Sequence, residues 1–158
     1  MTDPSDHDGA IWVITMSGMR NPGYHLRQLC RKLKVGGVLV AKIDLRDHRH
    51  FTEPFTFLTY DDETWKRHMR RGPQWEANMW RAPDYRNAFE RMHMPVLEWK
   101  TNRDAMPPHR PRVYVDVEMT DALRATFAPR FRAMSLGDLS VQFLGIIARK
   151  GPATDCRE

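Results

Sequence analysis

Residues 9–43 carry the pattern of a strand, a helix and a second strand, and this pattern constrains the fold most strongly. Residues 9–16 read Gly-Ala-Ile-Trp-Val-Ile-Thr-Met, an apolar run typical of a strand buried on both faces of a parallel sheet. Residues 22–33 repeat apolar side chains at helical spacing, which predicts an amphipathic helix with Asn21 as its N-cap. The run at 38–43 predicts the next strand. Since the connection is long enough for a crossover, we expect parallel strands joined in the right-handed sense.

The remaining segments are expected to form short helices, strands and loops. The predicted elements are helices at 61–70, begun by Asp61 or Asp62, at 84–93, with Pro83 at its start, and after Thr120, strands at 96–99 and 141–149, and an extended segment at 112–118. Residues 47–83 are rich in histidine, arginine and aromatic residues, and we expect them to pack as a lid over the edge of the sheet. The proline-rich stretch 101–112 predicts a loop, and residues 151–158 predict a frayed tail.

Length and composition indicate one domain without a membrane span. The chain has 158 residues, 41% of them hydrophobic, and its net charge of +5 is spread along the sequence. No apolar run approaches the roughly 18 residues of a membrane span, and the acidic start, Met-Thr-Asp-Pro, is unlike a signal peptide. Two cysteines, Cys30 and Cys156, make no disulfide scaffold, so we expect a soluble protein in a reducing cytoplasm, with Cys30 in the core.

Common nucleotide-binding and hydrolase motifs do not occur in the sequence, which contains no GxxxxGK[ST], HExxH, GxSxG or GxGxxG. His48 and His50, with Asp44 and Asp47 nearby, have a spacing that would suit a metal site, because alternate residues of a strand point the same way. A polar loop at the end of a strand explains these residues more simply. We therefore predict no metal.

Two segments resemble a known family when they are taken in order. Residues 29–40 are similar to the stretch R-V-L-K-P-G-G that leads into the fifth sheet strand of class I S-adenosylmethionine-dependent methyltransferases, with Val35 in place of the usual proline. Residues 43–48, Ile-Asp-Leu-Arg-Asp-His, resemble the I-D-L-x-D-H segment of a bacterial branch of that family. A glycine pair lets a chain leave a helix and enter a strand within a few residues, which gives the match a physical reason.

A third segment continues the resemblance. That branch often carries N-R-x-R-x-S-D-Y-R-x-x-F-E before its next helix, and the residues in register are Asn78, Arg81, Asp84, Tyr85, Arg86, Phe89 and Glu90. Residues 146–150 resemble its closing strand. The resemblance extends over residues 8–150 and concerns the C-terminal portion of the family's domain.

The resemblance implies an α/β fold that forms the C-terminal half of a doubly wound, Rossmann-like methyltransferase sheet. Residues 9–16 and 38–43 would be two parallel strands. Residues 96–100 and 141–149 would be an antiparallel closing pair, with the last strand inserted between its neighbours. Residues 1–150 would then form a single partial domain that includes the aromatic lid.

The resemblance also implies S-adenosylmethionine as cofactor. The family binds it on a glycine-rich turn after the first strand and with an acidic residue after the second, near the point where strand order reverses. This sequence starts near the family's fourth strand, contains neither feature, and has Trp12 and Val13 where the family has polar residues. We therefore expect partial cofactor contacts at Trp12 and Val13 at best, and weak or no cofactor binding by this chain alone.

The candidate residues on the side of the methyl acceptor follow the second predicted strand. They are Asp44, Asp47, His48 and His50, with Asn78 and Arg81 as weaker candidates. Ligands bind at the carboxyl ends of parallel strands, and methyl transfer requires the protein to position the acceptor and to accept a proton. Each of these side chains could instead anchor the lid by hydrogen bonds.

Three functions stay open on the sequence. They are a segment of a methyltransferase that acts on a small-molecule acceptor, a non-catalytic methyltransferase-like subunit or truncated gene product, and a basic nucleic-acid-binding module. The last would use Arg67, Arg70, Arg71, Trp65 and Trp75. If the family's first three strands are absent, the strand at 9–16 becomes a sheet edge. We then expect a homodimer or a partner chain that completes the sheet at this edge.

Overall fold

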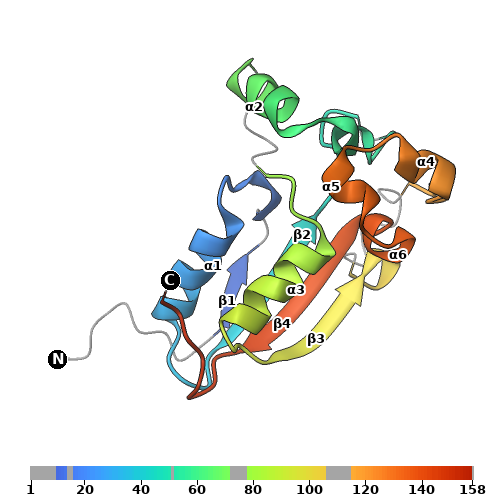
Figure 1. Ribbon diagram of the computed structural model, residues 1–158. Coiled ribbons are helices and arrows are strands. Elements are labelled where there is room, and N and C mark those ends of the chain that lie inside the picture. Colours follow the sequence, from blue (N-terminus) through green and yellow to red (C-terminus); the bar gives the residue numbers. More distant parts are fainter. Residues whose placement is uncertain (1–9, 14–15, 51, 72–77, 106–114, 158) are drawn as a thin grey trace.

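A mixed sheet of four strands forms the centre of the protein (Figure 1). The computed structural model describes residues 10–13, 16–50, 52–71, 78–105 and 115–157. The strands are β1 (Ala10–Val13), β2 (Val38–Asp44), β3 (Val96–Thr101) and β4 (Phe143–Arg149), in the order β1-β2-β4-β3. β1 runs parallel to β2, and β4 lies antiparallel to both β2 and β3. The expected parallel pair, and the antiparallel last strand inserted between its neighbours, are confirmed.

Strand β1 is shorter than the strand predicted at 9–16. Residues Met16–Gly18 form a 3₁₀ turn, η1, and Met19 N donates a hydrogen bond of 3.2 Å to Met16 O. Met16 is nonetheless fully buried. The apolar pattern therefore continues past the strand because Met16 belongs to the core without belonging to the sheet. Residues 9, 14 and 15 lie outside the described part of the chain.

Helix α1 (Pro22–Lys32) begins where the sequence predicted. The side chain of Asn21 accepts a hydrogen bond of 3.0 Å from Tyr24 N, as an N-cap does. Pro22 occupies the first turn, where its missing N–H removes no intrahelical hydrogen bond. Residues after the crossover return to the sheet as β2, which explains the parallel pairing of β1 and β2.

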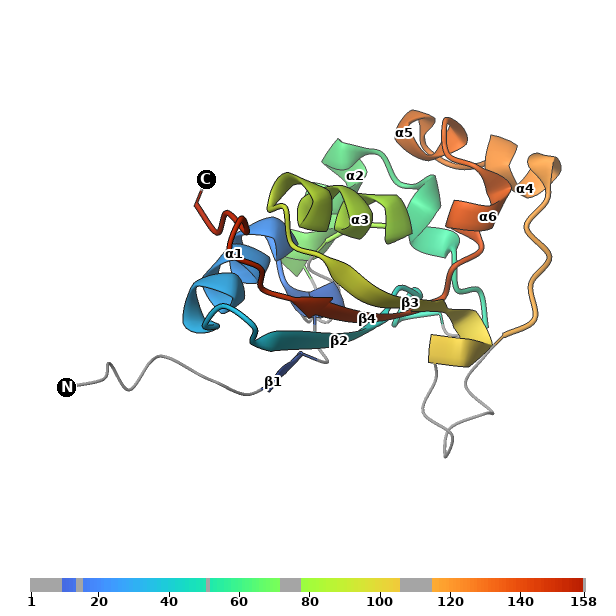
Figure 2. The same ribbon diagram turned by 90° about the horizontal axis from the view of Figure 1, so that it is seen from below.

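Helix α3 (Ala82–Arg91) starts before the predicted 84–93 and has Pro83 in its first turn. The carboxylate of Asp84 accepts a hydrogen bond of 2.7 Å from Arg81 N and so satisfies the end of the helix. Helices α1 and α3 lie over one face of the sheet (Figure 2), and their buried side chains form the main core with alternate residues of β2 and β4. None of the α-helices in the described ranges covers the other face. No described helix has the length and apolar composition needed to cross a bilayer.

A second core forms beyond the carboxyl end of β2. It joins the segments η2 (Thr56–Thr59), α2 (Asp62–Arg71), α4 (Asp121–Ala125), α5 (Pro129–Arg132) and α6 (Leu136–Leu139). Its buried side chains are Phe55, Phe57, Leu58, Trp65, Met79, Phe127, Ala128, Phe131 and Leu139. The aromatic segment expected over the sheet edge thus packs largely against the C-terminal helices. Asp61 and Thr120 are confirmed as caps, since each side chain accepts a backbone N–H hydrogen bond at the start of its helix.

Residues 115–118, which belong to the segment predicted as extended, lie outside the sheet. The buried Gln142 side chain accepts a hydrogen bond from Val115 N at 3.3 Å and donates one to Val115 O at 2.5 Å. A side-chain amide therefore takes the place of a neighbouring strand. Residues 112–114 lie outside the described part of the chain.

The C-terminal segment 151–157 is held against the helices, so the expectation of a frayed tail is wrong for these residues. Cys156 forms a disulfide with Cys30 of α1, and Asp155 N donates a hydrogen bond of 2.8 Å to Met92 O after α3. The expectation of two cysteines without a disulfide is also wrong. The pairing could not be predicted, because a separation of 126 residues carries no pairing signal in the sequence. The disulfide favours an oxidising environment over the reducing one expected.

Reduction of this disulfide is expected to lower the free energy of unfolding by roughly 2–4 kcal/mol, because the bridge restricts the unfolded chain. Urea unfolding with and without dithiothreitol measures the effect. Cys156→Ser is the matched control, and its midpoint should equal that of the reduced wild type and be insensitive to dithiothreitol. A wild-type midpoint that dithiothreitol does not change would contradict the disulfide.

Candidate functional site

Three polar side chains meet at the carboxyl end of β2. Asp44 ends the strand, and Arg46 donates two hydrogen bonds to its carboxylate, Nε to Oδ1 at 2.9 Å and Nη2 to Oδ2 at 2.6 Å. His48 Nε2 lies 3.5 Å from Asp44 Oδ2. The Arg46 guanidinium lies 4.6 Å from the ring centre of Phe143, which is the register partner of Asp44 on β4. The cluster of Asp44, Arg46 and His48, called the strand-end cluster below, is therefore held by both β2 and β4.

The carboxyl group of Asp44 is strongly acidic. Burial raises its pKa, but hydrogen bonds from Arg46 and His48 and the charge of Arg46 outweigh burial and lower the pKa to about 2. Such a carboxylate is a poor proton acceptor at neutral pH, so its chemical role is to balance charge and to orient its neighbours. Imidazole is the side chain suited to proton transfer near neutrality, and His48 is the imidazole that Asp44 orients.

Asp47 and His50 belong to a tight turn beside the strand-end cluster. Asp47 is 1% exposed, and its Oδ1 accepts hydrogen bonds from the N–H groups of Arg49 at 2.9 Å and His50 at 3.3 Å. Its own N–H donates to Pro54 O at 2.9 Å. Asp47 therefore holds the loop in shape.

The same loop lies near His68 of α2. Burial, followed by the charge of Arg49, lowers the pKa of His68, while Asp47 acts in the opposite direction. His68 could not be predicted from the sequence because no spacing links α2 to residues 47–50. The role of Arg46, whose side chain is only 3% exposed, was not predicted either.

The residues considered for a metal site are engaged elsewhere. Asp44 binds Arg46, and Asp47 binds backbone N–H groups. Among the residues that the structure describes, no group of three or more His, Cys, Asp or Glu side chains could hold a metal ion.

Arg81 is fully buried and joins three segments. Its Nη1 donates to Leu45 O at 2.6 Å, and its Nη2 donates to Leu139 O at 2.8 Å and Val141 O at 2.5 Å. Burial lowers the pKa of this guanidinium to about 10. With no exposed surface for an acceptor, Arg81 has the geometry of an anchoring side chain.

Asn78 is also bound to the backbone. Its Nδ2 donates to Met16 O at 2.9 Å and to Met19 O at 2.8 Å, while its Oδ1 accepts from Trp80 N at 2.9 Å. Asn78 thus ties the turn after β1 to the start of α3. The structure does not bring Asn78 and Arg81 into the strand-end cluster, and their contacts favour the anchoring alternative.

Trp12 and Val13 are described through their backbone alone, which pairs with Val40 and Ala41 of β2. β1 is a terminal strand of the described sheet. The resemblance implies that a glycine-rich turn and a ribose-binding acid would lie on strands beyond that edge, and the described residues include neither.

The aromatic residue considered for nucleic-acid stacking is part of the second core. Trp65 is 8% exposed and packs near Phe57, with ring centroids 6.1 Å apart. Base stacking needs an accessible ring face, so Trp65 does not provide one. The side chains of Arg70 and Arg71, and residue Trp75, lie outside the described part of the chain.

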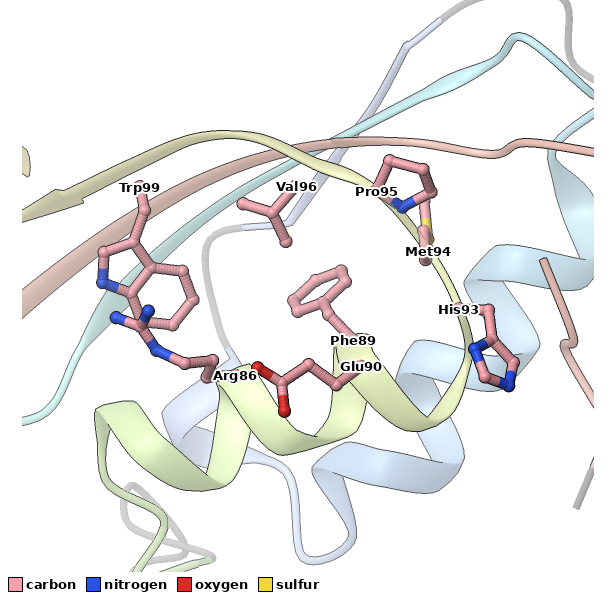
Figure 3. A pocket seen from close by; sticks show the side chains of 8 residues that line it. All are labelled: Arg86, Phe89, Glu90, His93, Met94, Pro95, Val96 and Trp99. Atoms are coloured by element: carbon pink, nitrogen blue, oxygen red, sulfur yellow. The ribbon is translucent and has the colours of Figure 1, made fainter. Parts of the chain in front are cut away.

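A pocket of about 600 Å³ lies between α3 and the edge strand β3 (Figure 3). Its lining is Arg86, Phe89, Glu90, His93, Met94, Pro95, Val96 and Trp99. The Arg86 guanidinium stacks over the Trp99 ring at 4.6 Å, and Glu90 lies on the same helix (Figure 3). This α3–β3 pocket contains none of the site residues predicted from sequence. The sequence did not indicate this pocket, because the apolar residues of α3 and of β3 are typical of core positions.

Comparisons with known proteins give little further information. No protein-family model and no curated protein sequence matches the chain. One solved structure with a similar backbone is a complex from Haloferax volcanii between the Trm112 methyltransferase activator and a candidate methyltransferase, at 17% identity and a TM-score of 0.48, over 94% of this chain and 57% of that one. Another is a candidate exported protein from Bordetella parapertussis, at 15% identity and a TM-score of 0.42, over 93% of this chain and 40% of that one. The chain thus spans about half the length of these structures, and likenesses at these TM-scores support no conclusion about function.

Asp44→Asn is expected to remove a pH-dependent part of the stability. Because the pKa of Asp44 is about 2 in the fold and 3.8 ordinarily, its ionised form stabilises the protein above about pH 4, and this stability is lost as the pH falls toward 2. Between about pH 4 and pH 2, the free energy of unfolding of the wild type should fall by about 2 kcal/mol more than that of Asp44→Asn, as measured by urea unfolding. Asp121→Asn, at an exposed ion pair with Arg124, should retain the wild-type pH profile. Identical profiles for Asp44→Asn and the wild type would contradict the strand-end geometry.

Arg81→Met is expected to lower the free energy of unfolding by roughly 3 kcal/mol or more, because it leaves three buried carbonyl oxygens without a donor. Arg81→Lys should fall between Arg81→Met and the wild type, since an ammonium group keeps the charge but not the fork of donors. Arg132→Met, at an exposed position of α5, is the control and should unfold like the wild type. Equal urea midpoints for Arg81→Met and Arg132→Met would show that the Arg81 hydrogen bonds contribute nothing.

Proposed function

We propose that the chain forms the acceptor-side portion of a class I methyltransferase-like domain. In this proposal residues 1–150 make one partial Rossmann-like unit, and polypeptide outside residues 1–158 contributes the portion that binds S-adenosylmethionine. The methyl acceptor would be a small molecule bound at the carboxyl ends of β1 and β2.

The observation that carries the proposal is the strand order β1-β2-β4-β3. A meander of three consecutive strands would place β4 beyond β3, whereas here the last strand lies between β2 and β3 and is antiparallel to both. The resemblance of the sequence to class I methyltransferases implies this inserted last strand. The topology therefore supports the same family as the sequence resemblance.

The sheet also has features of a larger structure. Within the part of the chain that the structure describes, β1 is paired on one side alone, by β2. Strands in parallel sheets are normally covered on both faces, but the described α-helices cover one face, and Val38, Val40 and Ile147 on the other face are only half-buried. Further strands beside β1 and helices on the second face would complete such a sheet.

The strand-end cluster suits the acceptor side of this domain. It lies at the carboxyl end of β2, where ligands of parallel sheets bind. Since His48 Nε2 faces the Asp44 carboxylate, the basic nitrogen of the neutral ring would be Nδ1. His48 would then take up the proton that a nitrogen or oxygen acceptor releases, while Arg46 keeps Asp44 ionised.

A non-catalytic methyltransferase-like subunit is the second candidate. The observation in its favour is that the side chains of Asp47, Asn78 and Arg81 all form hydrogen bonds with backbone groups of the fold. Only His48 and His50 among the six candidates then remain suited to proton transfer. Such a subunit would contribute the sheet edge and the second core to an assembly without supplying chemistry.

Calorimetric titration of the chain with S-adenosylmethionine is expected to give weak or no binding, because the cofactor-binding portion is assigned to other polypeptide. Sedimentation velocity on the same samples should show association that increases with concentration, since one edge of β1 is apolar in sequence and is paired by no described strand. A dissociation constant in the low micromolar range for a monomer would contradict the proposed division of the domain. A stable monomer at every concentration would contradict the incomplete sheet.

A further inference from the structure

A second pocket lies where α1, α3 and the C-terminal segment meet. Its volume is about 300 Å³, and it is lined by Gly23, Arg27, Ala88, Arg91, Met92, Asp155 and Arg157. Figure 1 shows the C-terminal end of the chain beside α1. The pocket lies apart from the strand-end cluster and shares no lining residue with the α3–β3 pocket.

Among the described residues, the charges around this pocket are unbalanced. Asp155 is the one acidic residue among them that lines it, and Arg157 occupies that carboxylate with Nε–Oδ1 and Nη2–Oδ2 distances of 3.0 and 3.3 Å. Arg27 and Arg91 form no ion pair with any residue that the structure describes. The pocket therefore presents two positive charges that no described acid neutralises.

The first turn of α1 forms one wall of the pocket. Arg27 Nη1 lies 3.6 Å from the position that a Cβ atom would take on Gly23, so its guanidinium lies back over the start of the helix. The N–H groups in a first helical turn carry partial positive charge, and α1 has 11 residues. The helix start thus adds to the positive potential that Arg27 provides.

The opposite wall depends on the disulfide. Cys156 is bonded to Cys30 of α1, its carbonyl oxygen accepts a hydrogen bond of 3.1 Å from Arg31 Nε, and Asp155 N donates to Met92 O at 2.8 Å. These bonds hold Asp155 and Cys156 against the two helices. Without the disulfide, the pair of Asp155 and Arg157 loses the covalent link that keeps it at the pocket.

We propose that this pocket binds the phosphate group of a small phosphorylated compound, and that the Cys30–Cys156 disulfide completes the site. A guanidinium presents parallel N–H donors that match two oxygens of a phosphate. Arg27 and Arg91 supply such donors from two helices, and the ion pair of Asp155 with Arg157 closes the opposite wall without adding net charge. A pocket of about 300 Å³ accommodates one or two phosphate groups, with the remainder of the compound outside.

Two alternative ligands fit the observations less well. A nucleic acid needs a basic groove along several nucleotides and exposed rings for stacking, but these charges surround one confined pocket. An apolar ligand suits the α3–β3 pocket better, because its wall contains Phe89, Val96 and Trp99 and its Arg86 shares the wall with Glu90.

Calorimetric titration of the oxidised protein with pyrophosphate, in a buffer of low chloride concentration, tests the site. We expect saturable binding below the millimolar range, and Arg27→Ala or Arg91→Ala should each weaken it about tenfold, the loss expected for hydrogen bonds to a charged group. Arg132→Ala on α5 removes the same charge outside the pocket and should bind like the wild type. An equal loss in Arg132→Ala, or no saturable binding by the wild type, would overturn the proposal.

The same titration tests the disulfide. Dithiothreitol is oxidised to its cyclic disulfide as Cys30 and Cys156 become thiols, and the reduced protein should bind pyrophosphate several-fold more weakly. Cys156→Ser should match the reduced wild type, with circular dichroism confirming that it is folded. Affinity that is unchanged by reduction would remove the disulfide from the site. A short single-stranded oligonucleotide that binds more tightly than pyrophosphate, through Arg27 and Arg91, would replace the small-molecule proposal with a nucleic-acid site.

Discussion

A single buried guanidinium links the two cores of this protein. Arg81 stands immediately before α3 and donates to backbone oxygens of Leu45, which follows β2, and of Leu139 and Val141, which precede β4. Its charge also lies 5.7 Å from the ring centre of Phe55 in the second core. Because burying this charge without its acceptors would be costly, the end of β2, the start of β4 and the start of α3 have to keep one arrangement. The strand-end cluster lies directly beside that junction and depends on it.

Local sequence patterns predicted the helices and strands that are determined by residues close together in the chain. The helical spacing and the Asn21 cap located α1, and alternation or continuous apolar runs located β2, β3 and β4 within a few residues. The same patterns failed where an apolar residue is buried for another reason, as at Met16, or where a side chain replaces a strand, as Gln142 does at Val115. Asp44 ends β2 and His48 follows it in the next loop, so both were predicted near one strand end, and the structure places His48 Nε2 3.5 Å from Asp44 Oδ2.

Contacts between segments that are distant in the chain left no pattern in the sequence from which they could be predicted. The Cys30–Cys156 pair, the approach of His68 to Arg49, and the three acceptors of Arg81 all join residues that are far apart in the chain. From the sequence, a charged residue could therefore have either a chemical or a structural role. Burial in the structure distinguishes the two roles. Arg81 has no exposed surface and stabilises the fold, whereas the half-buried His48 keeps some access to solvent.

Helix α3 is held at both of its ends, and this determines the shape of both pockets. Arg81 fixes its start to the strand ends, and the C-terminal segment, anchored by the disulfide, binds Met92 O at its other end. Between these points the ten residues of α3 supply walls to the α3–β3 pocket on one side and to the arginine-lined pocket on the other. A packed helix moves as a unit, because its side chains are closely fitted on the core face. Release of either end would therefore change both pockets together, because they share α3 as a wall.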